Sequence, residues 1–294
     1  MLKRFFYAAL IVAVVCAAAA LWLTRPGKVD PAEFAALSGD AEAGEDVYWA
    51  AGCASCHADK SDETRTLLSG GYHIVSDFGT FISPNVSTDP DHGIGTWTLE
   101  QFANAMLHGR TPSGAHYFPA FPFGSYTRME PQDVADLWAF LQTLPPSDVP
   151  SEPHDVGFPF NVRLAVGGWK LLFFNDDWVG PAETDQMARG RYLVEAMGHC
   201  AECHTPRNAL GGLDTARWMA GAPNPSGQGK IPGLTPAQLN WSEADIAYYL
   251  ETGFTPDFDS AGGGMASVVQ NLSHLPAEDR EAIAAYIKAL PAAE

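Results

Sequence analysis

The pentapeptide CASCH occupies residues 53–57, and a second one, CAECH, occupies residues 200–204. Two thiols three positions apart can form thioethers with the two vinyl groups of one haem, and the adjacent histidine then lies beneath the iron as an axial ligand. A single C-x-x-C pair is also found in zinc sites and in thioredoxin-like redox centres. Two complete motifs without spare ligand cysteines favour haem over both alternatives. The sequence therefore predicts two covalently bound haem c groups, attached through Cys53, Cys56, Cys200 and Cys203, with His57 and His204 as axial ligands of the irons.

The two motifs lie in two similar halves of the chain. Trp97 stands 12 positions before Gly109, and Trp241 stands 12 positions before Gly253. Further on, residues 133–145 and 279–291 carry apolar side chains in the same register at helical spacing, with an aspartate at the start and a proline at the end. This internal repeat predicts two domains of the same fold. We expect an anchor or signal segment at 1–28, a first domain at 29–150, an aromatic-rich linker at 151–182 and a second domain at 183–294.

The order of elements in each half resembles a class I cytochrome c. Short helical patterns at 44–52 and 189–198 lead into the motifs, so each motif is expected to end a helix. A loop containing Pro84 or Pro232, a middle helix and a terminal helix with an aromatic residue follow. The resemblance implies an all-α fold of tandem class I cytochrome c domains after an N-terminal membrane helix. It also implies that the first and last helices of each domain cross, and that each loop proline carbonyl orients the proximal histidine.

Class I cytochromes usually supply a methionine from the loop before the terminal helix as the sixth iron ligand. By that resemblance, Met129 in the first half and Met265 in the second half are the candidates. A lone methionine more often packs in a core, so this alternative stays open for both. Competing ligands for the first iron are four histidines, namely His73, His92, His108 and His116.

The N-terminus predicts export. Residues 5–23 contain no charged side chain, and Lys3 and Arg4 precede them. This apolar stretch is close to the roughly 20 residues that span a bilayer and is longer than a typical signal core. The basic pair would stay in the cytoplasm, which places the rest of the chain on the periplasmic side of the bacterial inner membrane, anchored by residues 5–23. Cleavage near the small residues 18–20 is the alternative, and Cys16 is interpreted as apolar filler.

The chain carries a strongly negative net charge. Lysine and arginine number 17 against 35 aspartates and glutamates, for a formal net charge of −18. Nucleic acid is excluded as an expected partner because phosphate backbones require a basic face. An acidic surface suits docking to basic patches on other proteins, although it also simply favours solubility.

Several longer segments resemble the cytochrome c subunits of membrane-bound periplasmic dehydrogenases that oxidise alcohols, gluconate or sorbitol. They are FGTFISPN at 78–85, HGIGTW at 92–97, FPAFP at 118–122 and the stretch 198–208. The resemblance implies electron transfer from a dehydrogenase catalytic subunit to ubiquinone, a terminal oxidase or another cytochrome. Typical members carry three haem motifs, whereas this chain has two. Some members place the methionine where Phe121 stands, and Met129 is then its substitute here.

Two functional classes follow from these patterns. The first is a relay that transforms no substrate and is therefore not itself an enzyme. The alternative is a di-haem redox enzyme of the peroxidase or thiosulfate-oxidising type, which requires that one iron has an open site. The aromatic segment 158–178 is expected to pack between the domains or to form a docking surface for a partner.

Overall fold

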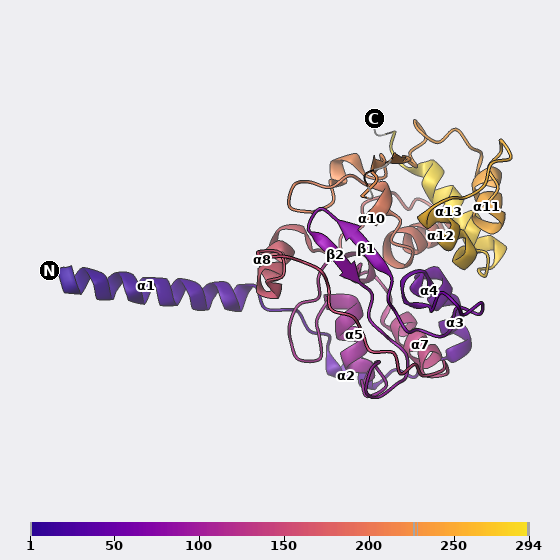
Figure 1. Cartoon of the computed structure of the whole chain (residues 1–294). Helices are drawn as coiled ribbons and strands as arrows, with labels where there is room; N and C mark the ends of the chain where they lie inside the picture. Colours follow the sequence, from indigo (N-terminus) through magenta and orange to yellow (C-terminus); the bar gives the residue numbers. More distant parts are fainter. Residues whose placement is uncertain (1, 226, 228, 293–294) are drawn as a thin grey trace.

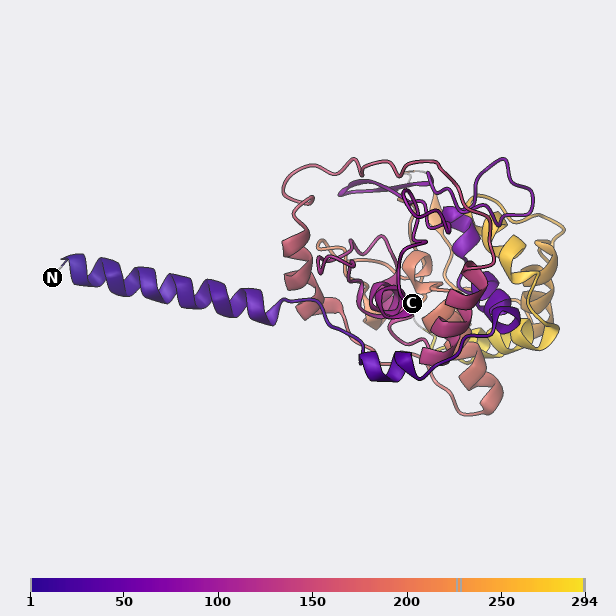
Figure 2. The same cartoon turned by 90° about the horizontal axis from the view of Figure 1, so that it is seen from below.

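The computed structural model describes residues 2–225, 227 and 229–292. One long helix, α1 (Leu2–Leu23), projects from a rounded body that holds the other elements (Figures 1 and 2). The described part of the body is mostly helical, as the sequence predicts, with two short antiparallel hairpins in addition. Neither hairpin was indicated by the sequence, because strands of two to four residues leave no alternating pattern to detect.

Apart from α2 and η2, both halves follow one order: a helix before the motif, a short motif helix, a hairpin, a middle helix, a helix before the last one and a terminal helix. The first half contains α2 (Pro31–Ala35), α3 (Ala41–Ala50), α4 (Cys53–His57), β1 (His73–Ser76), β2 (Gly79–Ile82), α5 (Leu99–His108), α6 (Phe123–Tyr126) and α7 (Pro131–Leu141). Helix α8 (Arg163–Phe173) follows. The second half contains α9 (Asp185–Arg191), the π-helix η1 (Tyr192–Met197), α10 (Ala201–His204), the 3-10 helix η2 (Thr215–Arg217), β3 (Ala222–Pro223), β4 (Lys230–Ile231), α11 (Glu243–Thr252), α12 (Gly264–Leu272) and α13 (Ala277–Ala289).

The middle helices, α5 and α11, show how closely the local structures repeat. Thr98 caps α5 in a capping box with Gln101, and Ser242 caps α11 in the same way with Asp245. Each helix ends at a glycine in the left-handed region, Gly109 with φ 52° and Gly253 with φ 77°. The Trp-to-Gly spacing of the sequence therefore reflects one capped helix of fixed length.

The first and last helices of each half cross at a glycine. A Cβ at Gly44 of α3 would lie 2.0 Å from the carbonyl oxygen of Asp136 in α7. A Cβ at Gly190 of α9 would lie 1.9 Å from the carbonyl oxygen of Ala282 in α13. The two backbones approach this closely only because neither glycine has a side chain. The expected crossing is confirmed, and these glycines set its distance.

The motifs begin new helices rather than ending the preceding ones, which corrects the expectation from sequence. Helix α3 stops before Gly52, whose φ of 66° redirects the chain into α4. In the second half, η1 ends before His199, whose φ is 42°, and α10 follows. A left-handed residue breaks the helical path, so each motif forms a short helix at an angle to the one before it.

The aromatic linker packs partly between the halves, as one of the two expectations proposed. Phe174 contacts Phe123 of the first half, with ring centroids 5.6 Å apart. Trp169 donates a hydrogen bond from Nε1 to the carbonyl oxygen of Leu210 in the second half, at 3.1 Å. Phe173 covers Gly212 so closely that a Cβ there would lie 2.4 Å from its ring.

Lys170 of α8 points inward and should make stability depend on pH. Its Nζ donates to the carbonyl oxygens of His108 and Gly109, and burial lowers its pKa from 10.5 to about 8. Between these pH values the unfolded chain binds more protons than the folded chain, so the free energy of unfolding rises with pH. We expect this rise to amount to about 2 kcal/mol between pH 8 and 10.5 and to be missing in Lys170→Met. Urea denaturation across that range measures it, and parallel curves for both proteins would contradict the prediction.

Candidate haem sites

The histidine of each motif is held by a proline carbonyl. His57 Nδ1 lies 2.9 Å from the carbonyl oxygen of Pro84, and His204 Nδ1 lies 2.8 Å from that of Pro232. A carbonyl oxygen can only accept, so Nδ1 must carry the proton in both rings. Nε2 then keeps its lone pair for a metal, and within the described residues neither Nε2 makes a hydrogen bond. The expected orienting role of both proline carbonyls is confirmed.

The surroundings of the motifs keep these groups uncharged. Burial lowers the pKa of both histidines below their ordinary value, so the rings are neutral at pH 7. Burial also raises the pKa of Cys53 and Cys200 to about 12 and that of Cys56 to about 11. Each motif thus offers two neutral, partly accessible sulfurs one helical turn apart for covalent attachment of a haem, and beside them an oriented imidazole to bind its iron. The residues present fit that group in both halves.

The two motif regions face each other across the contact between the halves. Ser55, inside the first motif, accepts a hydrogen bond of 2.8 Å from Nδ2 of Asn271 in α12. Ser267, also in α12, lies 3.0 Å from the same hydroxyl. A Cβ at Gly52, which precedes the first motif, would lie 3.7 Å from Nε2 of His199, which precedes the second. The attachment segments of both halves therefore meet in one region of the molecule.

Aromatic side chains close the same contact. Trp49 of α3 stacks on His274, with ring centroids 3.8 Å apart and planes 5° from parallel. Tyr126 donates a hydrogen bond of 2.9 Å to the carbonyl oxygen of Ala51, and its ring lies 5.8 Å from that of His199. Each of these residues lies within eight positions of a motif or in the segment before a terminal helix. The contact is thus built around the candidate haem sites.

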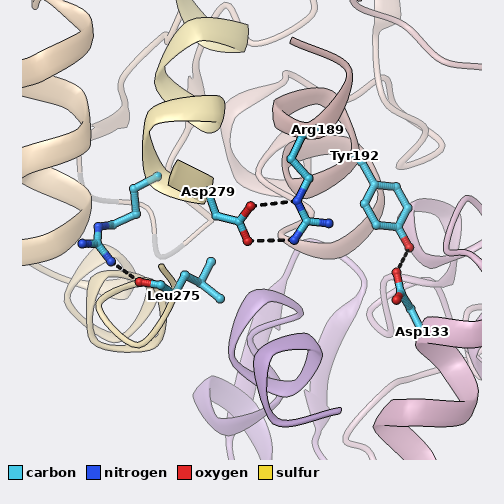
Figure 3. A network of polar contacts seen from close by, with 6 residues as sticks. Asp133, Arg189, Tyr192, Leu275 and Asp279 are labelled. Carbon is cyan, nitrogen blue, oxygen red and sulfur yellow. Dashed lines mark hydrogen bonds and ion pairs between the residues drawn. The ribbon is translucent and has the colours of Figure 1, made fainter. Parts of the chain in front are cut away.

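A polar network fixes the terminal helices nearby. Figure 3 shows Tyr192, at the start of η1, pointing its hydroxyl at the carboxylate of Asp133 in α7, to which it donates a hydrogen bond. Beside it, Arg189 forms a two-pronged ion pair with Asp279 of α13, at 2.8 and 2.7 Å. The Tyr192 contact joins the halves, and the Arg189 pair holds the second half together. The internal repeat marked Asp133 and Asp279 as the first residues of matching segments, but it did not indicate their partners, because the pairing exists only after the helices cross.

Met265 lies in the first turn of α12 and is half-buried. Gly263, immediately before the helix, has φ 56° and ψ −137°, a combination that only glycine adopts readily. This conformation lets the chain turn sharply into α12, so that Met265 in the first turn packs partly against the protein. Met265 stays the predicted sixth ligand of the second iron.

Met129 does not occupy the equivalent place in the first half. Tyr117 N donates to the carbonyl oxygen of Gly109, and Ala261 N donates to that of Gly253, so these two turns correspond. Phe121 lies four residues after Tyr117, and Met265 lies four residues after Ala261, so Phe121 and Met265 occupy equivalent positions.

Counting back from the terminal helices instead equates Met129 with the buried Leu275, because each stands four positions before the matching aspartate. Met129 is 4% exposed and precedes the N-cap of α7, Glu130. Val134, fully buried, stands at the fourth helical position, so the pair has the spacing of a hydrophobic staple. Met129 as an iron ligand stays a prediction, and the structure also provides it with a packing role.

The four competing histidines have other surroundings. His73 and His92 are exposed. A Cβ at Gly27 would lie 2.9 Å from Nδ1 of His108, so this ring covers the segment after α1. His116 is buried, and its Nε2 donates a hydrogen bond of 2.9 Å to the carbonyl oxygen of Thr24. These contacts place the rings of His108 and His116 beside the residues that follow α1.

Comparisons with known proteins show the family of this chain. The cytochrome c family model matches residues 41–145 and 187–291. A di-haem cytochrome c-type protein of Cereibacter sphaeroides is 58% identical over the full length of both chains.

More distant relatives are subunits of dehydrogenases. The cytochrome subunit of fructose dehydrogenase from Gluconobacter japonicus is 37% identical over 83% of this chain and 51% of its own length. The cytochrome c subunit of quinone-dependent alcohol dehydrogenase from Gluconobacter oxydans is 33% identical over 85% of this chain and 54% of its own. The chain thus spans about half the length of these dehydrogenase subunits. With two matched domains and two attachment motifs, the chain belongs to the cytochrome c family as a di-haem c-type cytochrome related to the cytochrome c subunits of membrane-bound dehydrogenases.

Proposed function

We propose that this cytochrome relays single electrons from the catalytic subunit of a periplasmic dehydrogenase to the respiratory chain. The acceptor would be ubiquinone, a terminal oxidase or another cytochrome. The observation that supports the proposal is the proximity of the two attachment segments: a Cβ at Gly52, next to Cys53, would lie 3.7 Å from Nε2 of His199, next to Cys200. Electron tunnelling falls steeply with distance, so neighbouring haems allow an electron to cross from one half to the other without leaving the protein.

The chain's own residues would set the properties of each redox centre. When bound, each haem supplies an iron that cycles between the ferrous and ferric states. We propose Cys53, Cys56, Cys200 and Cys203 as the covalent attachment points and His57 and His204 as proximal ligands. The Pro84 and Pro232 carbonyls would fix the ring orientations and raise the basicity of Nε2. Met265 would be the sixth ligand of the second iron and would raise its reduction potential.

The position of the relay in the cell follows from α1. This helix has no buried residue, and its 22 residues extend about 33 Å at 1.5 Å per residue, enough to cross a bilayer. We propose that α1 is retained as an anchor and that the body lies on the periplasmic side. The negative charge of the chain would favour a donor with a basic docking face.

Deletion of the gene in its host tests the relay. Oxygen uptake by membranes should fall with at least one dehydrogenase substrate among alcohols, fructose and gluconate, and the wild-type gene should restore it. The amount of each dehydrogenase catalytic subunit in the membranes is the control for assembly. Unchanged uptake with every one of these substrates would contradict this relay.

One observation favours a second candidate, the di-haem redox enzyme of peroxidase or thiosulfate-oxidising type. This function needs one open iron, and Phe121 stands where the second half has Met265. A phenyl ring cannot ligate iron, so the first haem would lack its ligand from that loop unless Met129 reaches it.

Carbon monoxide tests the coordination of the first iron. If Met129 ligates the first iron, as predicted, the fully reduced protein should bind no carbon monoxide. If Phe121 leaves that iron without a ligand and Met129 only packs in the core, one haem of the two should bind it. Difference spectroscopy with haem quantification measures the stoichiometry. If the wild type binds carbon monoxide at one haem, Met129→Ala should leave the spectrum unchanged and lower the free energy of unfolding by about 2 kcal/mol. If the wild type binds none and Met129→Ala binds one equivalent, Met129 is the ligand and the open-site enzyme is excluded.

A further inference from the structure

Helix α8 has its charged side chains inside and its leucines outside. The basic residues of the helix, Arg163 and Lys170, both turn toward the protein. Arg163 donates from Nη1 to the carbonyl oxygen of His116 at 2.9 Å, and Lys170 donates to those of His108 and Gly109. On a helix that faces water, these long cationic chains would lie on the outer side.

The outer side of α8 is apolar instead. Leu164, Leu171 and Leu172 are 56%, 61% and 66% exposed. At spacings of seven and eight residues they lie on one face of the helix, together with Gly168. Phe158 and Phe160, in the segment just before the helix, are also exposed and extend the same apolar character along the chain. Acidic side chains, Asp176 and Asp177, appear only after the helix has ended.

This apolar face lies where α1 leaves the body. Figures 1 and 2, seen from two directions, both place α8 at the end of the body nearest α1. The contact is direct, because a Cβ at Gly167 would lie 2.4 Å from the carbonyl oxygen of Thr24, the residue after α1. His116 binds the same carbonyl oxygen. Helix α8 is therefore joined to the emerging end of the proposed membrane helix through the buried Gly167.

The end of α1 has side chains suited to the lipid headgroup region. Trp22 is exposed, and the guanidinium of Arg25 lies over its ring at 4.9 Å. Lys28 is also exposed. Tryptophan and basic side chains gather at the membrane surface, where an apolar body and a polar tip are both satisfied. In a chain with net charge −18, a local basic segment beside an apolar helix face is compatible with phospholipid headgroups.

We propose that α8 lies in the surface of the same bilayer that α1 crosses, with Leu164, Leu171 and Leu172 inserted among the outer acyl chains. An interfacial helix of this kind inserts its apolar face roughly 5–10 Å deep. Lys170 and Arg163 stay on the protein side, where carbonyl groups satisfy them. Two contacts with the membrane, α1 and α8, would hold the body in one orientation rather than let it swing on residues 24–30. The inference rests on the proposed retention of α1.

Spin labels on the full-length holoprotein in phosphatidylcholine vesicles test this placement. Cys16→Ala removes the thiol outside the haem motifs, and single cysteines are then introduced at Leu164 and Leu172 for labelling. Tyr248→Cys on α11, 55% exposed and drawn far from α1 in Figure 1, is the matched control. Val12→Cys reports on α1 itself. Mass spectrometry of each purified chain shows whether α1 is retained.

The ratio of oxygen accessibility to accessibility toward a water-soluble nickel complex measures depth. We expect this ratio to be several-fold higher at Leu164 and Leu172 than at Tyr248, and highest at Val12. A ratio at both α8 positions equal to that at Tyr248, with Val12 lipid-exposed, would overturn the inference and leave the anchor intact. If the mass shows that α1 is cleaved, the anchor proposal fails by itself. Vesicle binding of the cleaved chain would then support the α8 contact, and its release into solution would overturn it.

Discussion

Replacing Met265 with histidine should lower the midpoint potential of one haem by on the order of 0.2 V, within the roughly 0.8 V that axial ligands span. A thioether stabilises ferrous iron relative to ferric iron, whereas an imidazole favours the ferric state. Met265 lies at the start of α12, where Gly263 lets the chain enter the helix abruptly. A redox titration that follows the visible absorption of both haems measures the shift.

The matched control is Met187→His on α9, a half-buried methionine that is not a ligand candidate. Its potentials should equal those of the wild type. If Met265→His leaves both potentials in place while the protein stays folded, Met265 does not ligate iron, and the coordination proposed for the second haem is withdrawn.

Adding a single methyl group at either helix crossing should destabilise the protein strongly. Gly44→Ala and Gly190→Ala each place a Cβ about 2 Å from a backbone carbonyl oxygen of the partner helix. A backbone atom cannot rotate away, so the helices must separate. We expect each variant to lose about 3 kcal/mol of unfolding free energy, despite the higher helix propensity of alanine. Guanidinium denaturation followed by far-ultraviolet circular dichroism measures the loss.

Gly124→Ala is the control for the substitution itself. Gly124 lies in α6, and a Cβ there would meet no atom within 4 Å. Its stability should match that of the wild type within about 0.5 kcal/mol. Losses below 1 kcal/mol in both crossing variants would show that the helices can move apart at little cost.

The haem chemistry and the internal repeat could be predicted from the sequence. Covalent attachment depends on residues that are adjacent in the chain, so CASCH and CAECH identify the cofactor without any tertiary information. The capped helices α5 and α11 are likewise local, because Thr98 and Ser242 satisfy backbone groups within the same turn. The proline carbonyls were predicted through resemblance, and the structure confirms their bonds to His57 and His204.

The folded structure was needed to identify the equivalent residues of the repeat and the contacts between the halves. The resemblance already indicated Phe121 as the place of the family's methionine, but only the hydrogen bonds to the carbonyl oxygens of Gly109 and Gly253 show that Phe121 is equivalent to Met265. The contact of Ser55 with Asn271 joins residues 216 positions apart, and no local pattern encodes it. The direction of Lys170 is also hidden in the sequence, since a helical lysine usually faces water. It faces inward here because two carbonyl groups and the ring of Phe123 receive its ammonium group, and α8 therefore turns its leucines outward.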